Sequence, residues 1–139
     1  MNYLLDTNVI SEPTKARPNE GVLNWLATVN EDTVFMSVVT VTELRYGIER
    51  LAASKRRSRL DAWLQKELIP RFEGRVLPVD LEIADACGRL VARTESRGRQ
   101  LEPRDAFLAA TAEVHGLALV TRNVSDFESI VGNIVTPWT

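Results

Sequence analysis

The chain has 139 residues and a formal net charge of −2; 45% of its residues are apolar and 26% are charged, which is typical of one globular domain and argues against disorder. Its single cysteine, Cys87, excludes an intramolecular disulfide, and its single histidine, His115, excludes a zinc site built from several histidines. We therefore expect one domain over residues 1–139, with any chemistry supplied by carboxylates, hydroxyls and basic side chains.

Short apolar runs alternate along the chain with stripes of helical spacing. The runs predict buried strands at residues 3–5, 34–36, 76–77, 118–120 and 134–135. The stripes predict helices near residues 22–29, 40–54, 60–70, 81–98 and 103–116. Strands without apolar–polar alternation, separated by helices, indicate a parallel sheet that is covered on both faces. The predicted fold is a three-layer α/β/α domain with a short, mainly parallel central sheet.

Four acidic residues fall where the predicted strands end or the following helices begin. Asp6 follows the first strand, Glu43 lies in the first turn of the helix opened by Thr40, Asp105 lies in the first turn of the 103–116 helix, and Asp126 lies in the loop after the fourth strand. Each has a structural explanation. Asp6 can cap a helix, Thr40 and Glu43 can form a capping box, Asp105 can complement a helix dipole, and Asp126 can form an Asx turn.

The four acids together point to a different interpretation. The carboxyl ends of parallel strands are where open α/β sheets bind ligands, so these carboxylates are expected to converge there. Carboxylates held close together either raise one another's pKa or bind a cation. An all-oxygen site without histidine favours Mg²⁺ or Mn²⁺, which can activate a water and neutralise a phosphoryl group. The pattern is typical of a metal-dependent phosphodiesterase.

The basic residues are concentrated in the middle of the chain. Residues 45–104 hold fourteen bases and nine acids, whereas the segments on either side are acidic. The densest run, KRRSR at residues 55–59, contains Arg56, Arg57 and Arg59. It is either a solvated helix start or a contact to the phosphates of a nucleic acid.

Four segments carry a resemblance to a known family: MNYLLDTNVIS at 1–11, SVVTVTELRYG at 37–47, PRDAFLAAT at 103–111 and LVTRNVSDF at 119–127. In this order and over the whole chain they resemble the PIN-domain ribonucleases, and more narrowly the VapC toxins of bacterial toxin–antitoxin pairs. The SEP that follows DTNVI and the PW near the end are similar to the FitB-like branch.

The resemblance implies a PIN fold, endonucleolytic cleavage of RNA with Mg²⁺ or Mn²⁺, and inhibition by a small DNA-binding antitoxin. It also implies a homodimer that meets DNA only through the antitoxin complex. The N-terminus MNYLLDTNVISEP shows no secretory signal and no apolar run is long enough to cross a membrane, so a cytoplasmic location is expected.

The resemblance also implies roles for single residues. Asp6, Glu43 and Asp105 correspond to the acidic metal-binding residues of the family, and Asp126 to a more variable fourth acid. FitB-like members often have an acid where this chain has Asn123, so either position could complete the site. The remaining two matches, Asn8 and Thr121, correspond to polar residues that orient carboxylates or water.

One alternative remains open beside the enzyme. A PIN-like scaffold could bind RNA or an antitoxin without cutting, although acids at all four positions favour catalysis. A haloacid-dehalogenase-like phosphotransferase is disfavoured because it needs a second acid where Asn8 stands. A receiver domain is disfavoured because none of the three lysines lies at a late strand end. A cleavage assay on RNA with and without EDTA separates enzyme from scaffold.

Overall fold

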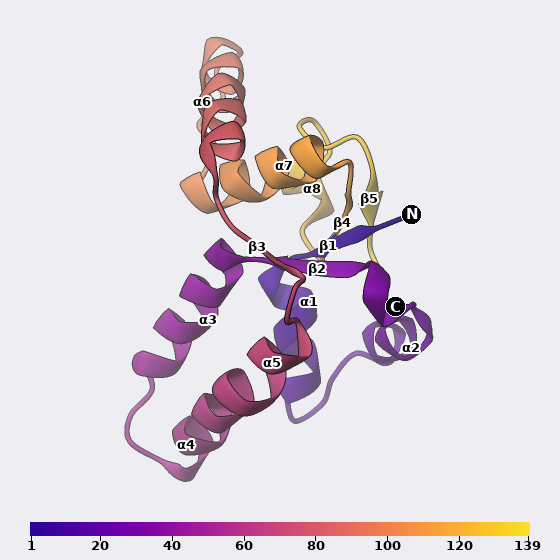
Figure 1. Cartoon of the computed structure of the whole chain (residues 1–139), viewed down its shortest axis with the longest axis vertical. Coiled ribbons are helices and arrows are strands. Elements are labelled where there is room, and N and C mark those ends of the chain that lie inside the picture. Colours follow the sequence, from indigo (N-terminus) through magenta and orange to yellow (C-terminus); the bar gives the residue numbers. More distant parts are fainter.

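A five-stranded parallel sheet forms the centre of the protein (Figure 1). The computed structural model describes the whole chain, residues 1–139. In chain order the strands are β1 (Tyr3–Leu5), β2 (Val34–Ser37), β3 (Val76–Leu77), β4 (Ala118–Val120) and β5 (Ile134–Val135). Their order in the sheet is β3-β2-β1-β4-β5, and every pairing is parallel. All five strands lie where the sequence predicts them.

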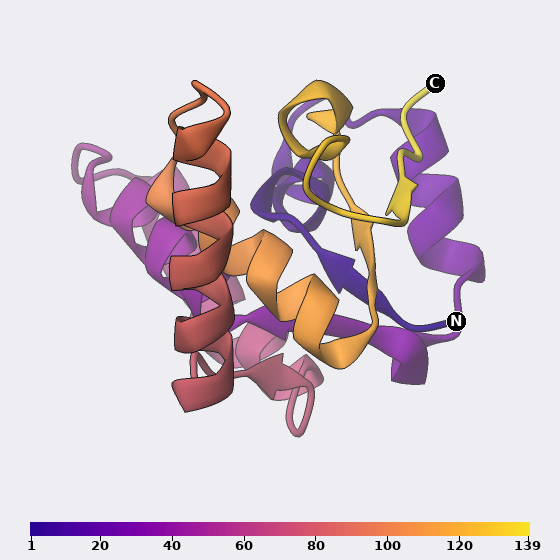
Figure 2. The ribbon, with the colours of Figure 1, turned by 90° about the horizontal axis from the view of Figure 1, so that it is seen from above.

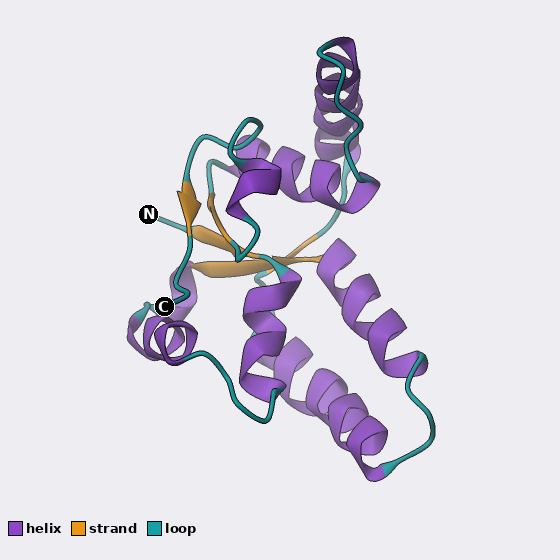
Figure 3. Ribbon diagram, turned by 180° about the vertical axis from the view of Figure 1, so that it is seen from behind, coloured by secondary structure: helices purple, strands orange, loops and turns teal.

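Helices cover both faces of the sheet, as expected (Figure 3). They are α1 (Thr7–Ser11), α2 (Glu20–Thr28), α3 (Val38–Glu49), α4 (Lys55–Ala62), α5 (Ile69–Arg71), α6 (Leu81–Ser96), α7 (Pro103–His115) and α8 (Val124–Phe127). The segment Trp63–Leu68 joins α4 to α5 as a wider π-helical turn, and short 3₁₀ turns lie at Glu12–Thr14 and Glu31–Thr33. None of these helices combines the length and the apolar character needed to cross a membrane.

The two helical layers have separate apolar cores. On one face, Leu5, Val9 and Met36 belong to the larger core beneath α1 to α5. On the other face, Leu4 of β1 and Leu108 of α7 are fully buried in the core between the sheet and the helices α7 and α8. Figure 2 shows α6 beside α7 on this second face, where a further small cluster of buried side chains joins the two helices.

The order of the strands reverses at β1. The chain moves from β1 outward to β2 and β3, then returns to place β4 on the other side of β1. The backbone N–H of Asp6 donates to the carbonyl oxygen of Val120 at 2.9 Å, so the carboxyl ends of β1 and β4 are held together. Such a reversal of strand order is where open α/β sheets bind ligands. The candidate site is therefore expected at this edge.

The start of α3 differs from the prediction. Strand β2 continues through Ser37, and the Ser37 hydroxyl caps the helix by accepting from the N–H of Val39 at 3.0 Å. Thr40 lies inside the helix, and its buried hydroxyl has no hydrogen-bond partner. The capping box predicted for Thr40 and Glu43 is therefore wrong, and Glu43 is free for another contact.

The end of α3 also differs, whereas the next helix ends where expected. Helix α3 ends at Glu49 and not near residue 54, because Ser54 caps α4 by accepting from the N–H of Arg57 at 3.1 Å. Proline has no N–H to donate to the preceding turn. Consistent with this, the wide turn over Trp63–Leu68 directly precedes the last helical turn, which contains Pro70 and ends at Arg71.

Glu12 is a buried acid that fixes the loop after α1. The residue is 3% exposed, one carboxylate oxygen accepts from the N–H of Asn19 at 2.9 Å, and the other lies 2.8 Å from Nζ of Lys15. We expect Glu12→Ala to lower the free energy of unfolding by about 1 kcal/mol, because it leaves the partly buried N–H of Asn19 without its protein partner. Urea denaturation at neutral pH measures this loss, with Glu73→Ala, an exposed acid without an ion pair, as the control.

The same contacts make this contribution depend on pH. The hydrogen bond from Lys15 and that from the Asn19 N–H lower the pKa of Glu12 below its ordinary value of 4.5. A lowered folded-state pKa means that the stabilisation is present above the ordinary value and disappears as the pH falls through the lowered one. The difference between wild type and Glu12→Ala should therefore narrow below pH 4.5. A difference that stays constant down to the acid-unfolding range would contradict this role for Glu12.

Candidate functional site

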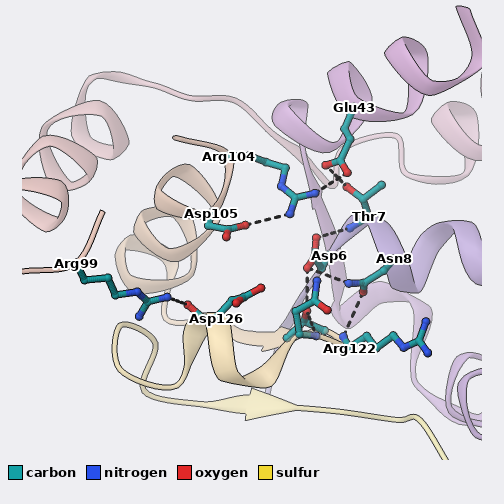
Figure 4. Close-up of polar contacts among 11 residues, drawn as sticks. Asp6, Thr7, Asn8, Glu43, Arg99, Arg104, Asp105, Arg122 and Asp126 are labelled. Carbon is teal, nitrogen blue, oxygen red and sulfur yellow. Dashed lines mark hydrogen bonds and ion pairs between the residues drawn. The ribbon is translucent and has the colours of Figure 1, made fainter. Parts of the chain in front are cut away.

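Asp6 is the most deeply buried acid of the site. It follows β1 directly and caps α1, as the sequence predicts: its Oδ1 accepts from the N–H of Thr7 at 2.7 Å. Its Oδ2 accepts from the Thr121 hydroxyl at 2.8 Å and from Nδ2 of Asn8 at 3.3 Å. The residue is 0% exposed, so these donors hold both carboxylate oxygens in place (Figure 4).

The two residues expected to orient carboxylates both contact Asp6. The Thr121 hydroxyl accepts from the N–H of Asn123 at 3.0 Å, so its own proton is directed toward Asp6. Asn8 accepts from the N–H of Arg122 through Oδ1 at 3.3 Å, which leaves its amide nitrogen to donate to Asp6. These contacts join the ends of β1 and β4 through side chains as well as through the backbone.

Glu43 and Asp105 face each other across an arginine. Nη1 of Arg104 lies 2.5 Å from Oε1 of Glu43, and Nη2 lies 3.1 Å from Oδ1 of Asp105. The second oxygen of Glu43 accepts from the Thr7 hydroxyl at 3.0 Å, which links it to the residue next to Asp6. Figure 4 shows these side chains meeting from α1, α3 and α7. The structure thus joins Glu43 to Asp105 through Arg104 and places Glu43 against the residue that follows Asp6, so the three predicted metal-binding acids lie in one region.

Arg104 is the residue that the sequence analysis missed. It stands in the PRDAFLAAT segment, directly before Asp105, but it was not assigned to the site. The available signal was its position: Arg104 is a basic residue directly beside Asp105, in a segment that resembles the family. Its partner Glu43 is 61 residues away, so the pairing itself could not be seen in the local sequence.

Burial raises the pKa of the two most buried acids of the site. It raises the pKa of Asp6, while the Thr121 hydrogen bond and the charge of Arg104 act in the opposite direction. Burial also raises the pKa of Asp105, which Arg104 opposes and the negative charge of Asp126 reinforces. For Arg104, burial disfavours the charged form, but the hydrogen bond and charge of Glu43 outweigh it and raise the pKa of the guanidinium. Arg104 therefore stays positive between the carboxylates.

Asp126 lies at the rim of the site. It belongs to the short helix α8, not to a loop, and its N–H donates to the carbonyl of Asn123. The Asx turn that could have explained Asp126 structurally is therefore not formed, and the predicted loop is a short helix. Its side chain is exposed and accepts no hydrogen bond, whereas its carbonyl oxygen accepts from Nη2 of Arg99 at 2.6 Å (Figure 4). Asn123 is also exposed, and it contributes its N–H to Thr121.

The donor set suits a hard divalent cation. Carboxylate oxygens are the ligands that Mg²⁺ and Mn²⁺ prefer, and two of the three acids are buried. No three acidic side chains lie close enough to share one ion in the present arrangement, because the guanidinium of Arg104 stands between Glu43 and Asp105. The site therefore already accommodates a cation between two of its acids, and the residues fit a divalent ion in their chemistry.

The basic run at residues 55–59 lies apart from these acids. It forms the start of α4, which begins beyond the far end of α3 (Figure 1). Arg57 donates to Glu49 at 2.7 Å, while Arg56 and Arg59 are exposed. The run is thus a helix start, and its contact with RNA phosphates remains a prediction.

Comparison with known proteins agrees with this geometry. The family model described as PIN domain matches residues 3–132. The chain is 40% identical to the VapC ribonuclease Y4jK of Sinorhizobium fredii over 97% of this chain and 96% of the relative. It is 36% identical to the toxin FitB of Neisseria gonorrhoeae over 97% of each chain.

Solved structures give the same result. FitAB bound to a DNA fragment matches with a TM-score of 0.92 and 34% identity, covering 99% of this chain and 96% of the other. VapBC-5 of Mycobacterium tuberculosis, from the VapBC family of toxin–antitoxin systems, matches with a TM-score of 0.70 and 26% identity, covering 97% and 96%. The fold and these matches show that the chain is a PIN domain. Within that class, the chain belongs to the VapC toxin family, which confirms the resemblance inferred from the sequence.

Proposed function

We propose that the protein is a metal-dependent endoribonuclease, the toxin of a toxin–antitoxin pair that a cognate antitoxin neutralises. The observation that carries this proposal is that Glu43 is joined to Asp105 through Arg104 and to the neighbour of Asp6 through Thr7, so acids far apart in sequence lie in one region at the carboxyl edge of the sheet of a PIN fold. The names of its relatives, a VapC ribonuclease and the toxin FitB, support both parts of it.

Asp6, Glu43 and Asp105 would hold Mg²⁺ or Mn²⁺. When bound, such an ion supplies Lewis acidity that makes water a better nucleophile at neutral pH and offsets negative charge on a phosphoryl group. Thr121 and Asn8 keep the Asp6 carboxylate in one orientation through their hydrogen bonds. Burial of Asp6 and Asp105 keeps these groups away from bulk water, which strengthens their attraction for a cation.

Asp126 is the better candidate for the fourth group. Its charge acts on Asp105, its carboxylate has no hydrogen-bond partner, and it is exposed to an incoming substrate. It can therefore accept a proton from the attacking water. Asn123 has a different task in this scheme, since its backbone N–H fixes the Thr121 hydroxyl.

A groove lined mainly by apolar side chains lies beside α1 and is our candidate for a partner surface. Apolar side chains of Ile10, Leu26, Trp63, Leu68 and Phe72 line a groove between α1, α2 and the helix that ends at Arg71. We infer that an apolar segment of the antitoxin binds in this groove and that DNA is met only through that complex. The structure of FitAB bound to a DNA fragment supports this order of assembly.

A cleavage assay tests the proposed activity. The purified chain, free of any partner, should cut a labelled single-stranded RNA internally in Mg²⁺, stop in EDTA, and resume when excess Mg²⁺ or Mn²⁺ is added. RNA that binds but stays intact under all three conditions would favour a silent scaffold instead. Cutting that continues unchanged in EDTA would contradict the metal dependence.

A further inference from the structure

Arg104 places a positive charge among the acids of the candidate site. One guanidinium joins Glu43 on α3 to Asp105 on α7, with its two terminal nitrogens on different carboxylates. Its charge also acts on Asp6, where it opposes the rise in pKa that burial causes. Arg104 therefore pairs directly with two of the three acids and acts on the third through its charge alone.

The other bases near this edge make contacts elsewhere. The guanidinium of Arg122 lies over the ring of Trp138 at 5.8 Å, and that of Arg99 donates to Ser129 and to the backbone of Asp126. The remaining donors to Asp6 are a backbone N–H, a hydroxyl and an amide, all of them neutral. Arg104 is thus the base that pairs directly with the acids of the site.

A guanidinium and a divalent ion make conflicting demands on Glu43 and Asp105. Mg²⁺ requires oxygen ligands at about 2.0–2.1 Å in near-octahedral geometry. Carboxylate oxygens that are hydrogen-bonded to Arg104 lie against a fixed positive charge, which repels a second cation. The Arg104 side chain is 36% exposed, so it has solvent into which it can move.

We propose that Arg104 is a built-in counter-cation of the site, which must leave Glu43 and Asp105 before a divalent ion binds and so sets the affinity for that ion. This inference rests on the proposed function, because it needs the three acids to be a metal site. By linkage, a competitor for the same carboxylates weakens ion binding, and removing it strengthens ion binding. A residue that merely holds the carboxylates in position would have the opposite effect when removed.

Mn²⁺ binding by the full-length protein tests the proposal without RNA. Isothermal titration calorimetry measures the binding, and the electron paramagnetic resonance signal of free Mn²⁺ measures it independently. We expect Arg104→Gln to bind Mn²⁺ about tenfold or more tightly than wild type, since neutral glutamine does not repel the ion. Arg122→Gln, which removes the same charge nearby without touching the acids, should change the dissociation constant by less than about threefold. Equal or weaker binding by Arg104→Gln would overturn the proposal.

Thermal unfolding supplies a second readout. Without metal, Arg104→Gln should melt below wild type, because the acids lose their compensating charge. With Mn²⁺ it should gain more than wild type does, because a tighter ligand stabilises the folded state more. An equal loss with and without Mn²⁺ would mean a purely structural role and would contradict the proposal. If Arg104→Gln does not fold, Arg104→Met, which keeps an aliphatic stem but carries no charge, should bind Mn²⁺ more tightly than wild type for the same reason.

The Asp105→Asn variant distinguishes a failure of the role proposed for Arg104 from a failure of the proposed metal site. If wild type and Arg104→Gln bind Mn²⁺ equally and Asp105→Asn binds none, the metal site stands and the role of Arg104 is wrong. If none of the three proteins binds Mn²⁺, the proposed metal site is wrong and the inference is overturned with it.

Discussion

Replacing Asp105 by asparagine is expected to lower the rate of RNA cleavage by about a hundredfold or more while the protein stays folded. Asp105 is 6% exposed, and its Oδ1 accepts the hydrogen bond from Arg104. Asparagine has the same shape and keeps that acceptor, but it brings no negative charge to a divalent ion. Initial rates on a labelled RNA at saturating Mg²⁺, together with a thermal melt of each protein, measure the two effects.

Glu102→Gln is the matched control. Glu102 is exposed, makes no capping hydrogen bond at the start of the same helix, and its charge also acts on Asp105. Its loss removes the same charge from this helix end but none from the site, so cleavage should stay within about threefold of wild type. Wild-type cleavage by Asp105→Asn would remove Asp105 from the site, and equal losses in both variants would assign the effect to charge at the helix end.

The sheet and the position of the acids could be predicted because their signals are local. Each buried strand is a short apolar run, as at Tyr3–Leu5, and a parallel strand must deliver the next residue to the carboxyl edge. Asp6 follows this rule directly. Asp105 reaches the same edge differently: it lies in the first turn of α7, which begins at the carboxyl edge because it returns the chain to the start of β4, a strand parallel to β1. Their location therefore depends on topology that the apolar pattern already contains.

The start of α3 could not be predicted in the same way. Ser37 and Thr40 both carry a hydroxyl suited to capping, and the residues that follow Thr40 match a capping box. The choice between them depends on how far β2 pairs with β3, where Ser37 is in register with Leu77. This is a tertiary contact, and it moves the helix start by two residues from Thr40 to Val38.

The charge balance of the site was likewise not visible in the sequence. Counting acids near strand ends predicts an unpaired cluster, but the guanidinium of Arg104 pairs with two of them. That pairing depends on α3 and α7 lying on either side of the carboxyl edge, which neither helix encodes alone. The acids of the site could therefore be selected from sequence, whereas their counter-charge could not.

Replacing Glu43 by glutamine is expected to remove most of the cleavage activity and to leave the unfolding midpoint near that of wild type. Since Ser37 caps α3, Glu43 has no role at the helix start, and its contacts are with Arg104 and the Thr7 hydroxyl. Glutamine can still accept from Arg104 through its carbonyl oxygen, and the hydroxyl can accept from its amide. What glutamine lacks is the negative charge that a hard cation requires.

Ser37→Ala provides the converse change and completes the test. It removes the observed cap, so it should cost about 1 kcal/mol of stability and lower the unfolding midpoint by a few degrees. Well below that midpoint it should cleave RNA at nearly the wild-type rate, because Ser37 contacts none of the three acids through its side chain. Melting curves and cleavage rates of the two variants should therefore separate in opposite directions. A Glu43→Gln protein that melts like Ser37→Ala and still cuts RNA would make Glu43 a structural residue and leave the proposed ion with two acids.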